Sequence, residues 1–129
     1  MRMHGCIILL LFLSLAGCGQ KKHYDGPTVD AFRGRLVHDG KPVSFPDNEE
    51  VILELGFHGT GRRYGIPIAA DGSFKIGWMP IGKYSPTLLR TDKEGKKVPL
   101  TTRYKLPGEF TIEEGKTEYT VELGKGWKP

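Results

Sequence analysis

The residues of this chain with the most evident capacity for chemistry lie in a glycine-rich segment, residues 56–65. His58, Arg62, Arg63 and Tyr64 stand there among glycines, which allow backbone N–H groups to turn toward an anion. Two arginine side chains could also clamp a carboxylate or a phosphate. The segment is not a P-loop, because no Gly-Lys-Ser/Thr opens a helix. It predicts a small-anion or carbohydrate site, and the alternative is a hairpin with solvated charges.

The other polar residues form no recognisable metal-binding or catalytic pattern. His23, His38 and His58 are far apart and lie in no cluster of metal-ligating residues. The serines lack a nucleophile-elbow context. The pairs Glu49-Glu50 and Glu113-Glu114 would face opposite sides of a strand, so neither pair forms an acid and base on one face. We therefore expect no metal, no cofactor and no enzymatic activity.

The beginning of the chain has the pattern of a secretion signal. Arg2 supplies a positive charge, and residues 6–17 are uncharged and apolar on all sides. This run is too short to cross a bilayer, which needs about 20 apolar residues. A positive start, a short apolar stretch and small residues before a cleavage site are typical of a signal peptide.

A more specific motif lies at the end of this signal. Leu15-Ala16-Gly17-Cys18 resembles the lipobox of bacterial lipoproteins. The resemblance implies that diacylglycerol is attached to the Cys18 sulfur, that residues 1–17 are removed, and that acyl chains hold the protein on a membrane. Because no Asp follows Cys18, the outer membrane is favoured over the inner membrane, with the domain in the periplasm or outside the cell. The alternative is an ordinary secretory signal, or a short anchor, with an incidental cysteine.

Cleavage before Cys18 would leave a weakly basic chain without a thiol. Of the two cysteines, Cys6 leaves with the signal and Cys18 becomes a thioether. Removal of Arg2 reduces the 19 basic side chains by one, against 15 acidic ones, for a net charge of about +3. Nucleic-acid binding needs basic residues gathered on one face. Charges of both signs are mixed along this chain, so we expect no nucleic-acid partner.

Beyond a polar tether at residues 18–29, the sequence predicts strands rather than helices. Eleven extended tether residues would reach on the order of 35 Å. The 18 glycines and 9 prolines favour turns, as at Asp39-Gly40 and Asp71-Gly72. Between the turns lie seven short alternating or β-branched runs, which predict a seven-stranded antiparallel Greek-key sandwich over residues 30–124: residues 31–37, 51–57, 63–69, 73–78, 83–91, 109–112 and 118–123.

Three of these turns carry a second resemblance. Residues 34–43, 70–74 and 80–84 resemble the G-x-V-x-x-D-G-K-P-L, D-x-D-G-x-F and P-P-G-x-Y segments of carboxypeptidase-regulatory-like, transthyretin-like domains. The order of these segments is that of the family, and the closing pair of strands also fits. The resemblance implies a prealbumin-like or immunoglobulin-like sandwich with a structural or binding role and supplies no catalytic residues. Residues 56–65 depart from the family pattern.

The sequence thus predicts a signal peptide at 1–17, a lipidated Cys18 with its tether, a sandwich at 30–124 and a tail at 125–129. The predicted function is a non-catalytic, membrane-anchored module that meets a cell-envelope protein or polysaccharide through loops or edge strands. Trp78 and Tyr84 are expected in the core. Trp127 could cap one end of the sandwich or remain exposed to a partner.

Overall fold

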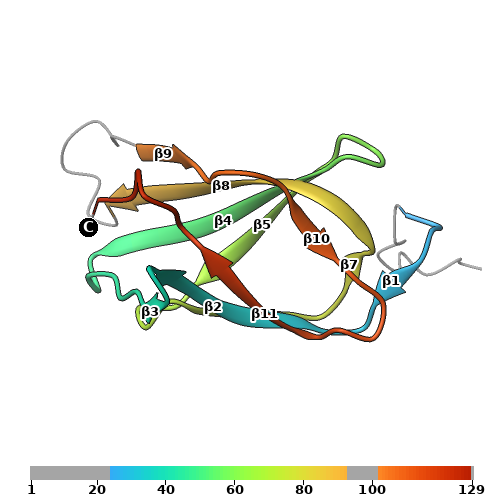
Figure 1. Ribbon diagram of the computed structural model, residues 1–129, viewed down its shortest axis with the longest axis horizontal. Helices are drawn as coiled ribbons and strands as arrows, with labels where there is room; N and C mark the ends of the chain where they lie inside the picture. The colour runs from blue at the N-terminus through green and yellow to red at the C-terminus, as the bar shows by residue number, and fades with distance from the viewer. Residues whose placement is uncertain (1–23, 93–101, 129) are drawn as a thin grey trace, which may run out of the picture.

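The computed structural model describes residues 24–92 and 102–128, which form strands, turns and loops. Cys18 and the predicted signal lie outside the described residues. Within them, no helix is long and apolar enough to span a bilayer. Two sheets face each other as a sandwich, with the β1 end and the C-terminal end at opposite ends of its long axis (Figure 1). The predicted all-β sandwich is confirmed.

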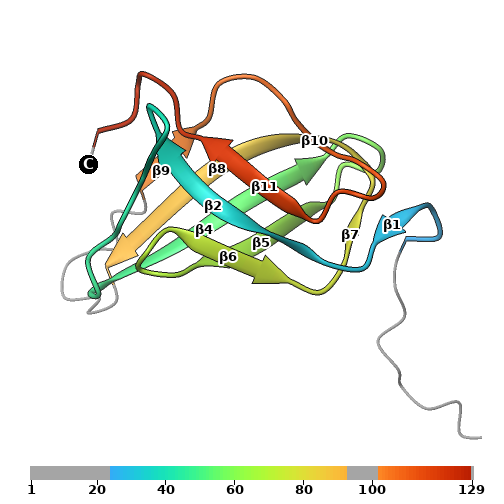
Figure 2. The same cartoon turned by 60° about the horizontal axis from the view of Figure 1, so that its bottom comes forward.

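The larger sheet has the order β5-β4-β8, with β9 and β10 following one another along the far edge of β8. Every pairing in it is antiparallel. Its members are β4 (Glu49–Phe57), β5 (Arg63–Ile68), β8 (Gly82–Asp92), β9 (Thr102–Lys105) and β10 (Phe110–Ile112). The smaller sheet contains β2 (Phe32–His38), β3 (Lys41–Pro42), β6 (Ser73–Ile76) and β11 (Glu118–Glu122). Both sheets are seen in Figure 2.

The smaller sheet corrects the expectation of a wholly antiparallel sandwich. β2 is its central strand, with β6 and β3 antiparallel along one side and β11 parallel along the other. The parallel pair forms because the chain crosses from β10 in the larger sheet through the turn at residues 113–117 before β11 begins. A hairpin cannot join strands that run in the same direction. β2, an early strand of the domain, and β11, its last strand in the described residues, are therefore hydrogen-bonded neighbours.

Glycine makes this parallel pairing possible at one position. Gly34 lies opposite Tyr119 in β11 and Phe74 in β6. A Cβ atom placed on Gly34 would lie 2.0 Å from the Tyr119 carbonyl oxygen and 2.8 Å from the Phe74 ring. Real Cβ atoms do not approach backbone oxygen so closely. β2 and β11 can therefore approach as they do only because residue 34 has no side chain.

Alternating apolar side chains from both sheets fill the core. β4 supplies Val51, Leu53, Leu55 and Phe57, each at most 4% exposed. The strand predicted at residues 51–57 is confirmed, and its alternation places these four side chains in the core. Buried side chains of β2, β5, β6, β8, β10 and β11 complete a single cluster. Within it, the Phe32 ring contacts the rings of Phe74, Phe110 and Tyr119. Burying this apolar surface provides the main driving force for folding.

Tyr84 fastens one corner of the larger sheet. Its hydroxyl donates a 2.5 Å hydrogen bond to the Pro80 carbonyl oxygen four residues earlier, and the side chain is fully buried. Such a bond from tyrosine to upstream backbone resembles the tyrosine corner of immunoglobulin-like sandwiches. Burial raises the pKa of the Tyr84 hydroxyl far above its usual value. The hydroxyl thus remains a neutral donor and holds the turn between β7 (Met79–Pro80) and β8.

The folded domain begins earlier than the predicted boundary at residue 30. Thr28–Val29 form β1, which pairs with Met79–Pro80, and Val29 is buried. Upstream of this strand, the Tyr24 ring packs edge-on against Phe57 with 5.3 Å between the ring centroids. Residues 24–29 are therefore part of the domain and not of the tether. Tyr24 and Val29 pack their apolar side chains against this end of the sandwich.

The C-terminal residues also extend the domain beyond its predicted end at residue 124. Trp127 is only 6% exposed and packs against the Phe45 and Tyr104 rings. The Tyr104 hydroxyl donates a 2.6 Å hydrogen bond to the Leu123 carbonyl oxygen. Of the two interpretations left open for Trp127, the structure supports the cap. Residues 125–128 close one end of the sandwich instead of forming a free tail.

Arg90 completes this C-terminal cap. Its guanidinium lies over the Trp127 ring at 5.2 Å and the Phe45 ring at 5.5 Å. It also donates two hydrogen bonds, of 2.8 and 2.9 Å, to the Glu49 carboxylate. Both charged side chains are mostly shielded from solvent, which strengthens their interaction compared with a fully exposed pair. These contacts link β4 at Glu49 and β8 at Arg90 to the C-terminal residues 125–128.

Candidate functional site

The predicted site at residues 56–65 is a tight hairpin between β4 and β5. Gly61 has φ of 75°, which turns the chain back. The Phe57 N–H donates to Arg62 O, the Gly61 N–H to Phe57 O, and the His58 N–H to Lys83 O in β8. The Arg62 N–H lies 3.3 Å from the Thr60 hydroxyl oxygen. Most of the amide groups expected to face an anion therefore already have acceptors within the protein.

The two arginines of this hairpin do not converge. Arg62 lies over the Tyr64 ring at 5.5 Å, on the side that Tyr64 shares with the core. Arg63 belongs to the outer face of the larger sheet, where its guanidinium is 3.8 Å from the Glu54 carboxylate. Arg62, which directly precedes β5, and Arg63, its first residue, therefore have different partners on different sides of the sheet. The hairpin geometry gives no support to a clamp for one anion.

The Tyr64 side chain packs against other aromatic side chains. Its ring meets Trp78 and Tyr84 edge-on, with centroid distances of 6.3 and 6.4 Å. Its buried hydroxyl has no hydrogen-bond partner among the residues that the structure describes. Tyr64 is thus half-buried in an aromatic cluster and does not extend into a binding site beside His58.

His58 has an interaction that the sequence did not indicate. Its Nε2 atom is 2.7 Å from the Ser85 hydroxyl in β8. A serine beside a histidine is the start of a nucleophilic pair, but such a pair also needs a group that orients the histidine and donors for an oxyanion. Both side chains are exposed, and no hydrogen bond joins a carboxylate to His58 in the described part of the chain. The contact fastens the hairpin to β8.

A more extensive hollow than this hairpin offers lies elsewhere, on the outer face of the smaller sheet. It is an open groove of about 840 Å³ that extends onto Pro67, Ile68 and Ala69 at the neighbouring edge of β5. Three register rows define it. Glu118, Arg33 and Lys75 lie side by side in one row, and Thr120, Arg35 and Ser73 in another.

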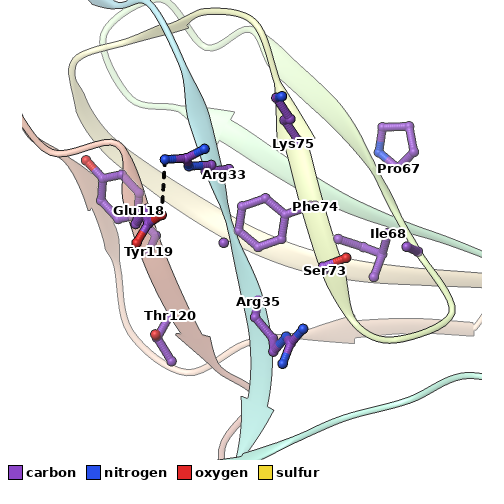
Figure 3. A pocket seen from close by; sticks show the side chains of 12 residues that line it. Arg33, Arg35, Pro67, Ile68, Ser73, Phe74, Lys75, Glu118, Tyr119 and Thr120 are labelled. Carbon is purple, nitrogen blue, oxygen red and sulfur yellow. Dashed lines mark ion pairs between the residues drawn. The ribbon is translucent and has the colours of Figure 1, made fainter.

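Between these two rows runs a third, made of Tyr119, Gly34 and Phe74. The Tyr119 and Phe74 side chains turn inward and are each 5% exposed. Gly34 has no side chain, so the backbone of three strands forms the floor. Figure 3 shows the long outward side chains standing on either side of this floor. Same-face residues of a strand lie about 6.5 Å apart, so the groove crosses the strands with walls at about this separation.

The walls carry charge of both signs. Arg33 is 3.1 Å from the Glu118 carboxylate, and Arg35 is 3.8 Å from Asp71. All four side chains are about half exposed or more, so these pairs are weak and open to exchange. Hydrogen bonds from Ser73, first from its hydroxyl and then from its N–H, lower the pKa of the Asp71 carboxyl. Lys75 has no ion-pair partner among the described residues.

This groove was not predicted from the sequence, although part of its signal was present. Arg33 and Arg35 alternate with Phe32, Gly34 and Leu36, which indicates a strand with one cationic face. The neighbours β6 and β11 come from distant parts of the chain, and the parallel pairing fixes which of their side chains flank the arginines. No metal site is added, because the described residues contain no group of three or more His, Cys, Asp or Glu side chains able to hold an ion.

Comparisons with known proteins assign no family. No protein-family model matches the chain, and neither does any curated protein. Among solved structures, a DUF3823 family protein from Parabacteroides merdae is similar, with a TM-score of 0.42 and 17% identity. The likeness covers 77% of this chain and 47% of that one, so this chain spans about half the length of that protein. Function is therefore inferred from the residues of this chain.

Proposed function

We propose that this protein is a bacterial lipoprotein, anchored by acyl chains on Cys18, whose β-sandwich serves as a non-catalytic interaction module of the cell envelope. The observation that carries the proposal is the Leu15-Ala16-Gly17-Cys18 motif at the end of an apolar run. The folded domain follows this motif closely, since Tyr24 already packs on Phe57 and β1 begins at Thr28.

The resemblance to carboxypeptidase-regulatory-like domains belongs to the same proposal. Its three matched segments lie at the β2–β3 turn, the β5–β6 turn and the corner before Tyr84. Asp39, Gly40 and Gly72 have positive φ at the first two of these turns. Domains of this kind usually have structural or binding roles, which supports a module that presents surfaces to other envelope components.

The early start of the domain sets its distance from the membrane. Six residues lead from Cys18 to Tyr24, which already packs on Phe57. Fully extended, these residues reach about 20 Å. This is much less than the 35 Å or so expected from a tether that ends at residue 29. The end of the sandwich that carries β1 therefore faces the membrane, and the opposite end, where the C-terminus lies (Figure 1), points away from it.

The anchor is tested by Cys18→Ala in a bacterial host. The unaltered protein should lose residues 1–17, gain the mass of two or three acyl chains and sediment with membranes, whereas the variant should lack acyl mass and leave the membrane fraction. Intact-mass spectrometry and fractionation measure both properties. Cys6→Ala is the matched control and should behave as the unaltered chain, because Cys6 lies within the removed signal. If Cys18→Ala and the unaltered protein behave alike, the lipoprotein assignment is wrong.

The non-catalytic role is tested at Ser85. A fluorophosphonate probe labels a serine whose hydroxyl is activated by a neighbouring base, and a histidine acts as such a base best when an acid orients it. The exposed His58–Ser85 pair lacks such an acid among the described residues, so labelling should equal that of Ser85→Ala. Gel fluorescence and mass spectrometry detect the adduct. Labelling that disappears in both Ser85→Ala and His58→Ala would contradict the proposal and identify a hydrolase.

A further inference from the structure

We propose that the groove between the Arg33 and Arg35 rows binds an acidic polysaccharide through the carboxylates of its sugar units. This inference rests on the proposed function in one respect: a location in the cell envelope would bring the groove into contact with such polysaccharides. It starts from the shape of the site. The groove crosses β11, β2 and β6 and continues to β5, so it is open at its sides and suits a chain better than a small enclosed molecule.

The charged groups of the walls fit a carboxylate-bearing ligand. Arg33, Arg35 and Lys75 point out from the two central strands of the groove. A planar guanidinium can receive a carboxylate with two parallel hydrogen bonds. The present partners of Arg33 and Arg35 are more than half exposed, with side-chain exposures of 74% for Glu118 and 64% for Asp71. A ligand carboxylate can replace such partners at little cost.

The same walls also offer acceptors, which favours a sugar over a simple anion. Glu118 lies next to Arg33 across the strand pair, and Thr120 lies next to Arg35. A polymer of sugar acids has hydroxyl donors and carboxylate acceptors on each unit, so it can use both kinds of wall residue. Pro67, Ile68 and Ala69 at the end of the groove supply an apolar contact for the C–H faces of a sugar ring.

A peptide fits this groove less well. Extended peptides bind by adding a strand to a free sheet edge or by placing side chains in pockets. β2, which forms the middle of the floor, is already paired on both sides, by β11 and by β6. The two aromatic side chains below the floor, Phe74 and Tyr119, are directed into the core. The centre of the floor, at β2, therefore offers a peptide neither a free edge nor an aromatic pocket.

The test uses the acylated chain in phosphatidylcholine nanodiscs, titrated calorimetrically with polygalacturonate, a polymer of sugar carboxylates. Neutral dextran and polyglutamate serve as comparison polymers. The double variant Arg33→Gln/Arg35→Gln should weaken polygalacturonate binding by about tenfold or more. Arg103→Gln/Lys105→Gln is the matched control, because it removes the same charge from exposed positions of β9 on the other sheet. It should change the affinity by less than about twofold.

The outcomes separate specific recognition from other causes. The inference is overturned if both double variants lose affinity equally, which would indicate diffuse charge attraction. It is also overturned if polyglutamate binds as tightly as polygalacturonate, or if the unaltered protein binds no polygalacturonate while it melts as a folded domain. Amide chemical shifts should change at β2, β6 and β11. The intact mass of the same sample reports acylation, so failure of the anchor and failure of the groove are distinguishable.

Discussion

Trp127→Ala is expected to lower the free energy of unfolding by about 3–5 kcal/mol, although Trp127 is next to last among the described residues. Trp127 is 6% exposed and contacts the rings of Phe45 and Tyr104. Its removal also takes away one of the two rings that hold the Arg90 guanidinium. The loss therefore includes buried aromatic surface and the support of the Arg90–Glu49 pair. Thermal melting followed by circular dichroism would show a decrease on the order of 10 °C or more.

Two controls identify the cause of this loss. Trp127→Phe keeps an aromatic ring and should lose clearly less stability than Trp127→Ala. Lys125→Ala alters the same tail at an exposed position and should remain within about 0.5 kcal/mol of the unaltered protein. If Trp127→Ala and Lys125→Ala have the same melting temperature, the packed cap is wrong. The alternative, in which Trp127 is exposed to a partner, would then be favoured.

Gly34→Ala should be similarly damaging, although it adds one methyl group. The new Cβ would lie 2.0 Å from the Tyr119 carbonyl oxygen, which is backbone and cannot rotate away. β11 must then separate from β2, or the register between them must change. Overpacking usually costs about 1–3 kcal/mol, and we expect about 3 kcal/mol or more here because backbone forms the obstacle. Urea denaturation measures the change through the unfolding midpoint.

Gly77→Ala provides the matched comparison. A Cβ at Gly77 meets no atom within 4 Å, and the residue is exposed. Alanine there should leave stability unchanged or raise it by up to about 1 kcal/mol, since it reduces the freedom of the unfolded chain. Equal midpoints for Gly34→Ala and Gly77→Ala would show that β2 and β11 do not approach as described.

The core of this fold could be predicted from local pattern. In β4 the alternation of Val51, Leu53, Leu55 and Phe57 permits one orientation, since a shift of one residue would expose all four side chains. The Asp39-Gly40 turn has φ of 52° and 77° at its two residues, values that Asp and Gly tolerate. Signals of this kind depend on near neighbours in the chain, so they can be interpreted without knowing the topology.

Features that depend on distant partners could not be predicted in this way. β9 has the polar sequence Thr102–Lys105 and becomes a strand because the edge of β8 is available to it. Pro86 lies within β8 opposite Leu55, although proline has no N–H to donate to a neighbouring strand. Its carbonyl oxygen accepts a hydrogen bond from the Leu106 N–H, at the interruption between β9 and β10. The missing N–H of proline is thus tolerated where the neighbouring edge is broken.

The candidate sites differ in the same respect. Arg62 and Arg63 are adjacent in sequence, which suggested a clamp, but Arg62 lies over Tyr64 while Arg63 pairs with Glu54 on the outer face. Arg33, Lys75 and Glu118 are widely separated in sequence and become neighbours only through the register of three strands. Proximity along the chain was therefore a poor guide to proximity in space.

The parallel pairing of β2 with β11 has a consequence for the time course of folding. Arg33 in β2 pairs with Glu118 near the end of the chain, so the smaller sheet cannot close until almost the whole chain is available. At about 5–20 residues per second, synthesis of the intervening residues takes on the order of 5–15 s. Contacts of such long range also slow the search for the native state. During that interval one edge of β2, from Arg33 to Val37, lacks its final partner. The nascent chain thus has a period of several seconds in which it is open to aggregation, or to handling by chaperones, before its last strand arrives.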